Sequence, residues 1–179
     1  SIFVHPSYAI TSTDPAYDLA LIKLASPLVN DSTFKRPLVD VAPNAMIGAS
    51  LRCYGFGDLS LTVDADGQLR RGTFVAQGDG GSGRVLVASS TSRVREGDSG
   101  GPCFRDVSGA TQIVGVFSTR SSSGGGGATL GGTWATQAWI NDTMEGTRLD
   151  PTTTTGYQPA VVRSPSYGWT AVIVRDDAG

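Results

Sequence analysis

The segment Gly97–Pro102 places a single hydroxyl, that of Ser99, among three glycines, an aspartate and a proline. Glycine adopts backbone angles that other residues resist, and it lets another chain approach closely. A serine in such a turn can stand exposed while neighbouring backbone N–H groups point at one spot. An acyl-transfer site needs that arrangement, a nucleophile beside an oxyanion hole. Gly-Asp and Ser-Gly pairs are also ordinary turn signals, so the alternative is a plain glycine turn.

Asp18 is the best candidate for a carboxylate that would assist this hydroxyl. A serine is a weak nucleophile at neutral pH and needs a base, which usually needs an orienting carboxylate. Asp18 stands where a polar loop enters an apolar strand, so we expect it to be buried beside Leu19 and Leu21. A buried aspartate must have a partner. The alternative is an aspartate that satisfies its own turn at the start of the strand.

These residues belong to a longer series that resembles the trypsin-like (chymotrypsin-fold) serine endopeptidases. The matching blocks are Asp-Leu-Ala-Leu-Ile-Lys-Leu at 18–24, Gly-Phe-Gly at 55–57, Gly-Asp-Ser-Gly-Gly-Pro at 97–102, Ile-Val-Gly-Val-Phe-Ser at 113–118 and Trp-Ile at 139–140. The resemblance covers roughly residues 1–146. It implies a double six-stranded antiparallel β-barrel with a C-terminal helix. This chain would hold the end of the first barrel and the whole of the second.

The resemblance also implies a chemical role for several positions. Ser99 would be the nucleophile of a serine endopeptidase that works through an acyl-enzyme, and Asp18 would orient a histidine. The backbone N–H groups of Gly97 and Ser99 would form the oxyanion hole. Asp98 would pair with the N-terminal ammonium that is freed when a zymogen is activated.

The substrate pocket that the resemblance implies would be lined by Ser118, Arg120 and Arg93. Arg93 takes the position at the base of the primary pocket, where it would reject Lys and Arg side chains and favour acidic ones. The alternative is a slipped register in which Arg93 points to solvent. Slippage is easy because a disulfide usual beside this pocket is absent: Arg95 occupies one expected cysteine position, and the run at 121–127 covers the other.

The chain has one histidine, His5, which lies 13 residues before Asp18. In the family the catalytic histidine precedes the aspartate by a much longer stretch, so we interpret His5 as a solvated loop histidine. The strand that would supply the family's N-terminus is missing too. Either the base lies on an associated N-terminal polypeptide from a cleaved precursor, or the chain is an inactive homologue that binds or acts as a scaffold. We favour the first, because half a barrel would expose strand edges and an apolar face.

Cys53 and Cys103 are the only cysteines, and composition leaves open whether they form a disulfide or remain buried thiols. The resemblance implies a bridge between the strand before Gly-x-Gly and the strand after the nucleophile. Each cysteine is shifted by two residues from the usual position, and on antiparallel neighbours these shifts compensate. We therefore predict a Cys53–Cys103 bridge and an oxidising compartment, with the protein secreted or periplasmic.

Composition favours an all-β fold of many short strands, because 24 of the 179 residues are glycine and only 17% are charged. The net charge of −2, without a cluster of Lys or Arg, gives no reason to expect nucleic acid or an anionic membrane surface as a partner. No apolar run is long enough for a membrane span. We expect no metal or other cofactor, and a protein or peptide as substrate.

The elements that must position these residues can be placed along the chain. Strands are predicted at 2–4, 17–24, 49–57, 59–65, 68–76, 84–90 and 113–119, with an Asp66-Gly67 hairpin turn, and a helix at 133–144. Residues 1–44 would end the first barrel and connect the two, and residues 45–146 would form the second barrel and the helix. Residues 147–179 look like a linker-like extension with one strand-like run at 169–174. That run could be a tail packed on the domain or the start of another module.

Overall fold

The computed structural model describes residues 1–10, 15–23, 38–60, 62–120, 126–148, 157–161 and 171–176. The strands are β1 (Ile2–Val4), β2 (Ala9–Ile10), β3 (Pro15–Ala16), β4 (Ala20–Lys23), β5 (Ser50–Gly55), β6 (Arg70–Gly81), β7 (Arg84–Ala88), β8 (Pro102–Val107), β9 (Ala110–Arg120), β10 (Gly127–Gly132), β11 (Tyr157–Val161) and β12 (Ala171–Asp176). One α-helix, α1 (Gln137–Arg148), and a short 3-10 helix at Pro43–Met46 complete the described elements. Parts of the predicted connecting region within 1–44, of the run at 121–127 and of the predicted extension at 147–179 lie outside these ranges.

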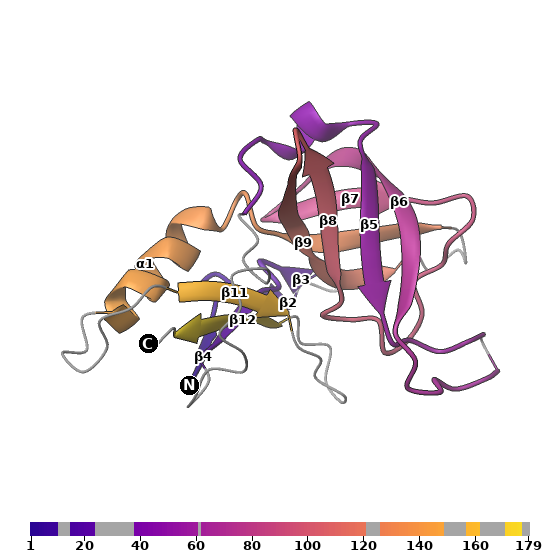
Figure 1. The fold of residues 1–179 in the computed structure, drawn as a ribbon, viewed down its shortest axis with the longest axis horizontal. Coiled ribbons are helices and arrows are strands. Elements are labelled where there is room, and N and C mark those ends of the chain that lie inside the picture. Colours follow the sequence, from indigo (N-terminus) through magenta and orange to yellow (C-terminus); the bar gives the residue numbers. More distant parts are fainter. Residues whose placement is uncertain are drawn as a thin grey trace.

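Six strands form a closed antiparallel barrel in the order β10-β7-β6-β5-β8-β9 (Figure 1). Burial alternates along β5 and along most of β6, as it must when one face of a strand points into a core. Phe74 and Phe117 meet edge to face inside the barrel, with ring centroids 5.3 Å apart. The predicted all-β class and the complete second barrel are confirmed.

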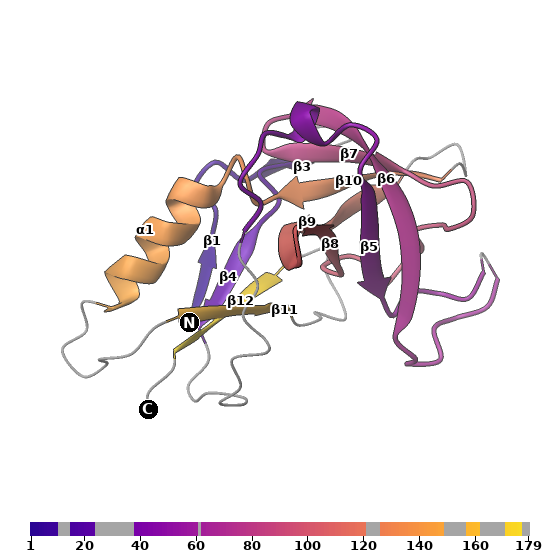
Figure 2. The same cartoon turned by 45° about the horizontal axis from the view of Figure 1, so that its top comes forward.

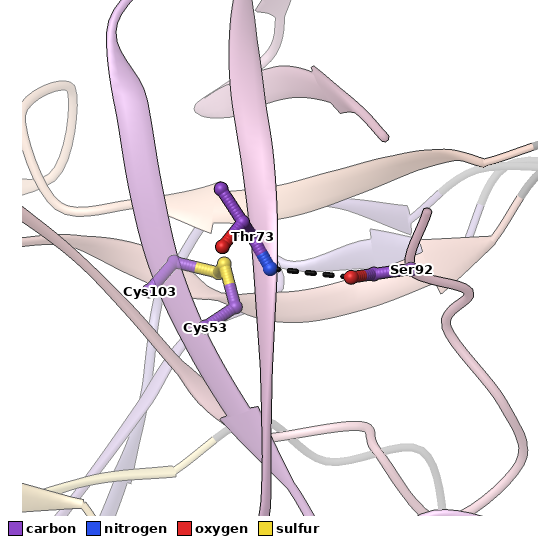
Figure 3. Close-up of a disulfide and its surroundings, with 4 residues drawn as sticks. All are labelled: Cys53, Thr73, Ser92 and Cys103. Atoms are coloured by element: carbon purple, nitrogen blue, oxygen red, sulfur yellow. Dashed lines mark hydrogen bonds between the residues drawn. A yellow bond between two sulfur atoms is a disulfide. The ribbon is translucent and has the colours of Figure 1, made fainter. Parts of the chain in front are cut away.

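A disulfide joins β5 to β8 inside this barrel. Cys53 and Cys103 are directly opposite in the antiparallel register, and both are buried (Figure 3). Beside them, the backbone N–H of Thr73 on β6 donates to the hydroxyl of Ser92, which lies in the segment that leads to Ser99. The predicted bridge is confirmed.

A second sheet has the order β1-β4-β12-β11 (Figure 2). β1 pairs with β4 antiparallel, and β12 pairs with the other edge of β4 in parallel, with Ala171 opposite Ala20. β11 is an edge strand and contains Pro159, a residue that sheets tolerate at edges because it lacks an N–H donor. The strand-like run predicted at 169–174 is therefore a strand at 171–176 that pairs with the end of the first barrel.

A small apolar cluster joins the second sheet, the barrel and the helix. Its buried members are Leu19, Leu21, Val116 and Ile140, with Phe3, Leu38 and Trp139 packed against them. The backbone of this region is bound to the barrel as well, because the N–H of Val39 donates to the carbonyl of Ile113 at 2.9 Å. Strand β4, which begins two residues after Asp18, and strand β9, which contains Ser118, are thus held against each other.

The strand predicted at 59–65 is wrong. None of the described residues of this segment belongs to a strand, and its apolar residues Leu59 and Val63 are exposed, at 44% and 49%. The Asp66-Gly67 turn exists, with Gly67 at φ +77° and the Asp66 carboxylate accepting from the N–H of Gln68. It does not join two strands, because β6 begins at Arg70 and pairs with β5 and β7 instead.

The helix begins four residues later than predicted. Thr136, just before Gln137, donates its hydroxyl to the carbonyl of Gly132, and Ile140 is fully buried. Trp134 precedes the helix and is 39% exposed, so it is not part of the helix face that packs on the core. Within the described ranges no helix is long and apolar enough to cross a membrane.

Candidate active site

Ser99 lies in the loop between β7 and β8. The loop makes two sharp turns, at Gly97 (φ +84°) and at Gly100 (φ +83°), which favour glycine at both positions. The N–H of Gly100 donates to the carbonyl of Phe117, and the N–H of Phe117 donates to the carbonyl of Gly101, both at 2.9 Å. Backbone hydrogen bonds to β9 therefore fix the loop, and the Ser99 side chain stays partly exposed.

The side chain of Asp98 holds the same loop through two hydrogen bonds to backbone N–H groups. Its Oδ1 accepts from the N–H of Gly57 at 2.8 Å, and its Oδ2 accepts from the N–H of Arg95 at 2.7 Å. A Cβ at Gly57 would lie 2.5 Å from the Asp98 carboxyl carbon, and a Cβ at Gly55 would overlap its Oδ1. Burial raises the pKa of Asp98, while the two N–H donors act in the opposite direction. The Gly-Phe-Gly segment is thus the space into which the Asp98 carboxylate fits.

Asp18 is buried, with 3% of its surface exposed, and so are Leu19 and Leu21. The predicted burial is confirmed. The required partner is Ser118, whose hydroxyl donates to Asp18 Oδ2 at 2.6 Å. Burial raises the pKa of Asp18, and the hydrogen bond from Ser118 opposes that shift.

Strand β9 connects the two candidate residues. Ser118, which binds Asp18, directly follows Phe117, whose carbonyl accepts from Gly100, the residue after Ser99. Two hydrogen bonds and one step along β9 therefore link the buried carboxylate to the serine loop. The structure thus links Asp18 to the loop of Ser99 through neighbouring residues of β9, and the roles of nucleophile and orienting carboxylate stay predictions.

The predicted oxyanion hole and the predicted pairing of Asp98 with an ammonium group also stay predictions. Among the described residues, none accepts a hydrogen bond from the N–H of Gly97 or Ser99. Asp98 is held by backbone N–H groups, as above.

The predicted substrate-binding arginines lie on the surface. Arg93 is exposed, and its Nη1 donates to the carbonyls of Ser89 at 3.2 Å and Ser92 at 3.0 Å. Arg120 is exposed at the end of β9, two residues after the serine that binds Asp18. Arg95, at the position of an expected cysteine, donates its backbone N–H to the Asp98 carboxylate.

His5 is not solvated, which corrects the sequence-based expectation. It is 8% exposed, stacked parallel on Tyr17 with centroids 4.8 Å apart and edge-on to Trp139 at 4.7 Å. Its Nδ1 accepts from the N–H of Ser7, and burial lowers its pKa. No hydrogen bond in the described structure joins its side chain to Asp18 or to the nucleophile.

Tyr17 was missed by the sequence reasoning as a residue of this site. Only its position next to Asp18 could have drawn attention to it, because its ring partners are far apart in the sequence. No group of three or more His, Cys, Asp or Glu side chains in the described segments is arranged to hold a metal ion.

Residues 1–140 match the family Trypsin. Among solved structures, the chain is similar to the scabies mite inactivated protease paralogue S-I1, with 20% identity and a TM-score of 0.45. The match covers 63% of this chain and 52% of the other, so the chain spans about half of that protein's length. No curated protein matches. The extent of the family match shows that the chain belongs to the trypsin family.

Proposed function

We propose that this chain is the nucleophile-bearing part of a serine endopeptidase. The observation that carries the proposal is the β9 connection, in which the Ser118–Asp18 hydrogen bond follows directly on the backbone bonds that hold the Ser99 loop. A plain glycine turn would need neither a buried carboxylate nor a strand that ties the two together.

In the proposed reaction, Ser99 Oγ attacks the peptide carbonyl and gives its proton to a histidine. The N–H groups of Gly97 and Ser99 bind the resulting oxyanion. The histidine then protonates the leaving amine, and water hydrolyses the acyl-enzyme by the same steps. Asp18 Oδ2 is engaged by Ser118, so Oδ1 is the atom that would accept from the histidine. Arg93 is exposed and its Nη1 donates to the carbonyls of Ser89 and Ser92, so we propose no preference for acidic substrate side chains.

The histidine would come from an associated polypeptide that is not part of this chain. His5 supports this, because its ring is buried between Tyr17 and Trp139. Without a base, the site would keep only the catalysis of binding and the oxyanion hole, about 10³–10⁴-fold over water. The disulfide and the family are consistent with an oxidising or extracellular compartment, and we propose that the protein is secreted or periplasmic.

Two measurements test the proposal. Intact mass spectrometry of the native protein should find a second, histidine-bearing polypeptide, and a fluorophosphonate probe should label that complex at Ser99. The isolated chain should hydrolyse p-nitrophenyl acetate faster when imidazole is added as a substitute base. Ser99→Ala should remove this imidazole-dependent part and leave the background rate of imidazole itself. If the fluorophosphonate probe never labels Ser99 in a folded complex, the enzyme proposal is wrong.

The burial of His5 also supports a second candidate, a catalytically inactive homologue that binds or serves as a scaffold. For that protein, no histidine-bearing polypeptide accompanies the chain. Imidazole then gives wild type and Ser99→Ala the same rate of ester hydrolysis.

A further inference from the structure

Tyr17, the residue before Asp18, has a left-handed backbone. Its φ of +47° is rare for a bulky residue, which persists there only when its surroundings enforce it. Its N–H donates to the carbonyl of Ser82 at 2.8 Å, and its carbonyl accepts from the N–H of Leu19 at 2.7 Å. The chain therefore turns sharply immediately before the carboxylate, and the direction of Asp18 depends on that turn.

The Tyr17 ring is confined on two sides. His5 stacks on it with an interplanar angle of 8°, and Trp139 of α1 meets His5 edge-on. Elsewhere the ring packs against Gly83, in the turn between β6 and β7. A Cβ at Gly83 would lie 2.7 Å from Tyr17 Cδ1, so only glycine leaves room for the ring at its present position.

His5 touches the chain on both sides of Asp18. Its ring stacks on Tyr17, the preceding residue, and its backbone N–H donates to the carbonyl of Leu19, the following residue, at 3.0 Å. Ser118 holds the carboxylate itself. The backbone of Asp18 is thus fixed from one direction and its side chain from another.

We infer that His5 and Tyr17 are positioning residues that hold Asp18 in the orientation in which its carboxylate can serve a base. The only histidine of the chain then contributes through its ring and its backbone, and takes no proton in the reaction. This inference rests on the proposed function for its catalytic meaning, while the positioning itself can be measured without activity.

Two glycine substitutions in one turn provide a matched pair. Gly83→Ala pushes on the Tyr17 ring, whereas Gly81→Ala adds a Cβ that meets nothing within 4 Å. Both glycines have positive φ, +76° and +68°, so both variants carry a similar backbone cost. The full chain, labelled with ¹³C at aspartate carboxyls, is titrated by NMR, and imidazole-dependent hydrolysis of p-nitrophenyl acetate is measured in parallel.

We expect Asp18 in Gly83→Ala to titrate closer to an ordinary aspartate, and the imidazole-dependent rate to fall at least 10-fold. Gly81→Ala should match wild type in both. His5→Ala should behave as Gly83→Ala, and His5→Phe, which keeps a ring, should recover most of the effect. If Gly83→Ala does not fold, Tyr17→Asn replaces it, because asparagine tolerates the left-handed backbone and lacks the ring.

Folded variants that keep the wild-type titration of Asp18 would overturn the inference. If the titration shifts as expected but wild type shows no imidazole-dependent turnover at Ser99, the positioning stands and the proposed enzyme fails. A rate loss without any change in Asp18 would also overturn the inference, since the effect would then reach the site by another route.

Discussion

The serine and the aspartate of this site are held by different kinds of interaction. Around Ser99, backbone N–H groups, glycines and a disulfide inside a closed barrel fix the loop. Around Asp18, side chains do the holding: the hydroxyl of Ser118 and the rings of His5 and Tyr17. Hydrogen bonds between backbone groups survive most side-chain substitutions, whereas a single substitution removes a hydroxyl or a ring and every contact that it makes. We therefore expect the serine side to be sensitive only at Asp98 and at the glycines that surround its carboxylate, and the aspartate side to be sensitive at each of its three supporting side chains.

Removing the disulfide should have the largest effect on stability. The bridge joins residues 50 positions apart, and losing such a crosslink typically costs about 2–5 kcal/mol. Urea unfolding of the double variant Cys53→Ala, Cys103→Ala should show this loss. Below the unfolding transition the Asp18 titration should stay as in wild type. A changed titration in the folded variant would mean that the two sides are not independent.

Ser118→Ala should cost about 1.5–3 kcal/mol, the range for hydrogen bonds to charged groups, because it leaves the buried Asp18 carboxylate without its partner. The pKa of Asp18 should rise further, since the bond from Ser118 opposes the effect of burial. Urea unfolding and carboxyl NMR would measure both. Ser118→Thr keeps a hydroxyl and serves as the control; equal losses in the two variants would contradict the hydrogen-bond explanation.

Gly55→Ala should cost about 1–3 kcal/mol by overpacking, because the new Cβ overlaps the Asp98 carboxylate. Asp98 would then move, so imidazole-dependent turnover at Ser99 should fall too. Gly48→Ala is the control: its Cβ meets nothing within 4 Å, and any loss there comes from its φ of +84°. Normal turnover in Gly55→Ala would show that the loop does not depend on the glycine at this position.

The smallest effect concerns pH. The folded state raises the pKa of Asp18 above the ordinary 3.8. At a pH between 3.8 and the raised pKa, the folded chain therefore holds a proton that the unfolded chain has lost. Stability from this group is therefore full below 3.8 and declines as pH rises through the raised value. Asp18→Asn removes the decline, and its thermal midpoint should exceed that of wild type at pH 7 and approach it near pH 3. If the thermal midpoints of wild type and Asp18→Asn change with pH by equal amounts, the prediction is wrong.

The site residues that lie within short sequence motifs could be predicted from the sequence. The serine string and the Asp-Leu-Ala-Leu block are local patterns, and the burial of Asp18 follows from the apolar strand that it precedes. The resemblance implied the Cys53–Cys103 bridge, and the structure places the two cysteines opposite each other in the register of β5 and β8. In each case the physical constraint lies within a few residues, or repeats with the two-residue period of a strand.

Two of the failures, the missed strand β10 and the environment of His5, share a cause, which is contact between segments that are distant in the sequence. β10 is built from Gly, Ala, Thr and Leu and has little intrinsic strand preference; it is a strand because β7 and β9 pair with both of its edges. His5 follows the same rule. The proline and serine after it indicate a loop, and its ring partners are 12 and 134 residues away.

Because β12 pairs with β4, the barrel and the second sheet can form at different times during synthesis. The barrel needs no residue after Gly132, so it can close while the rest of the chain is still being made. β4 cannot gain its second neighbour until residues 171–176 have been synthesised. Such long-range pairing is slow to form. The serine loop therefore matures first, and the sheet beside Asp18 is completed last.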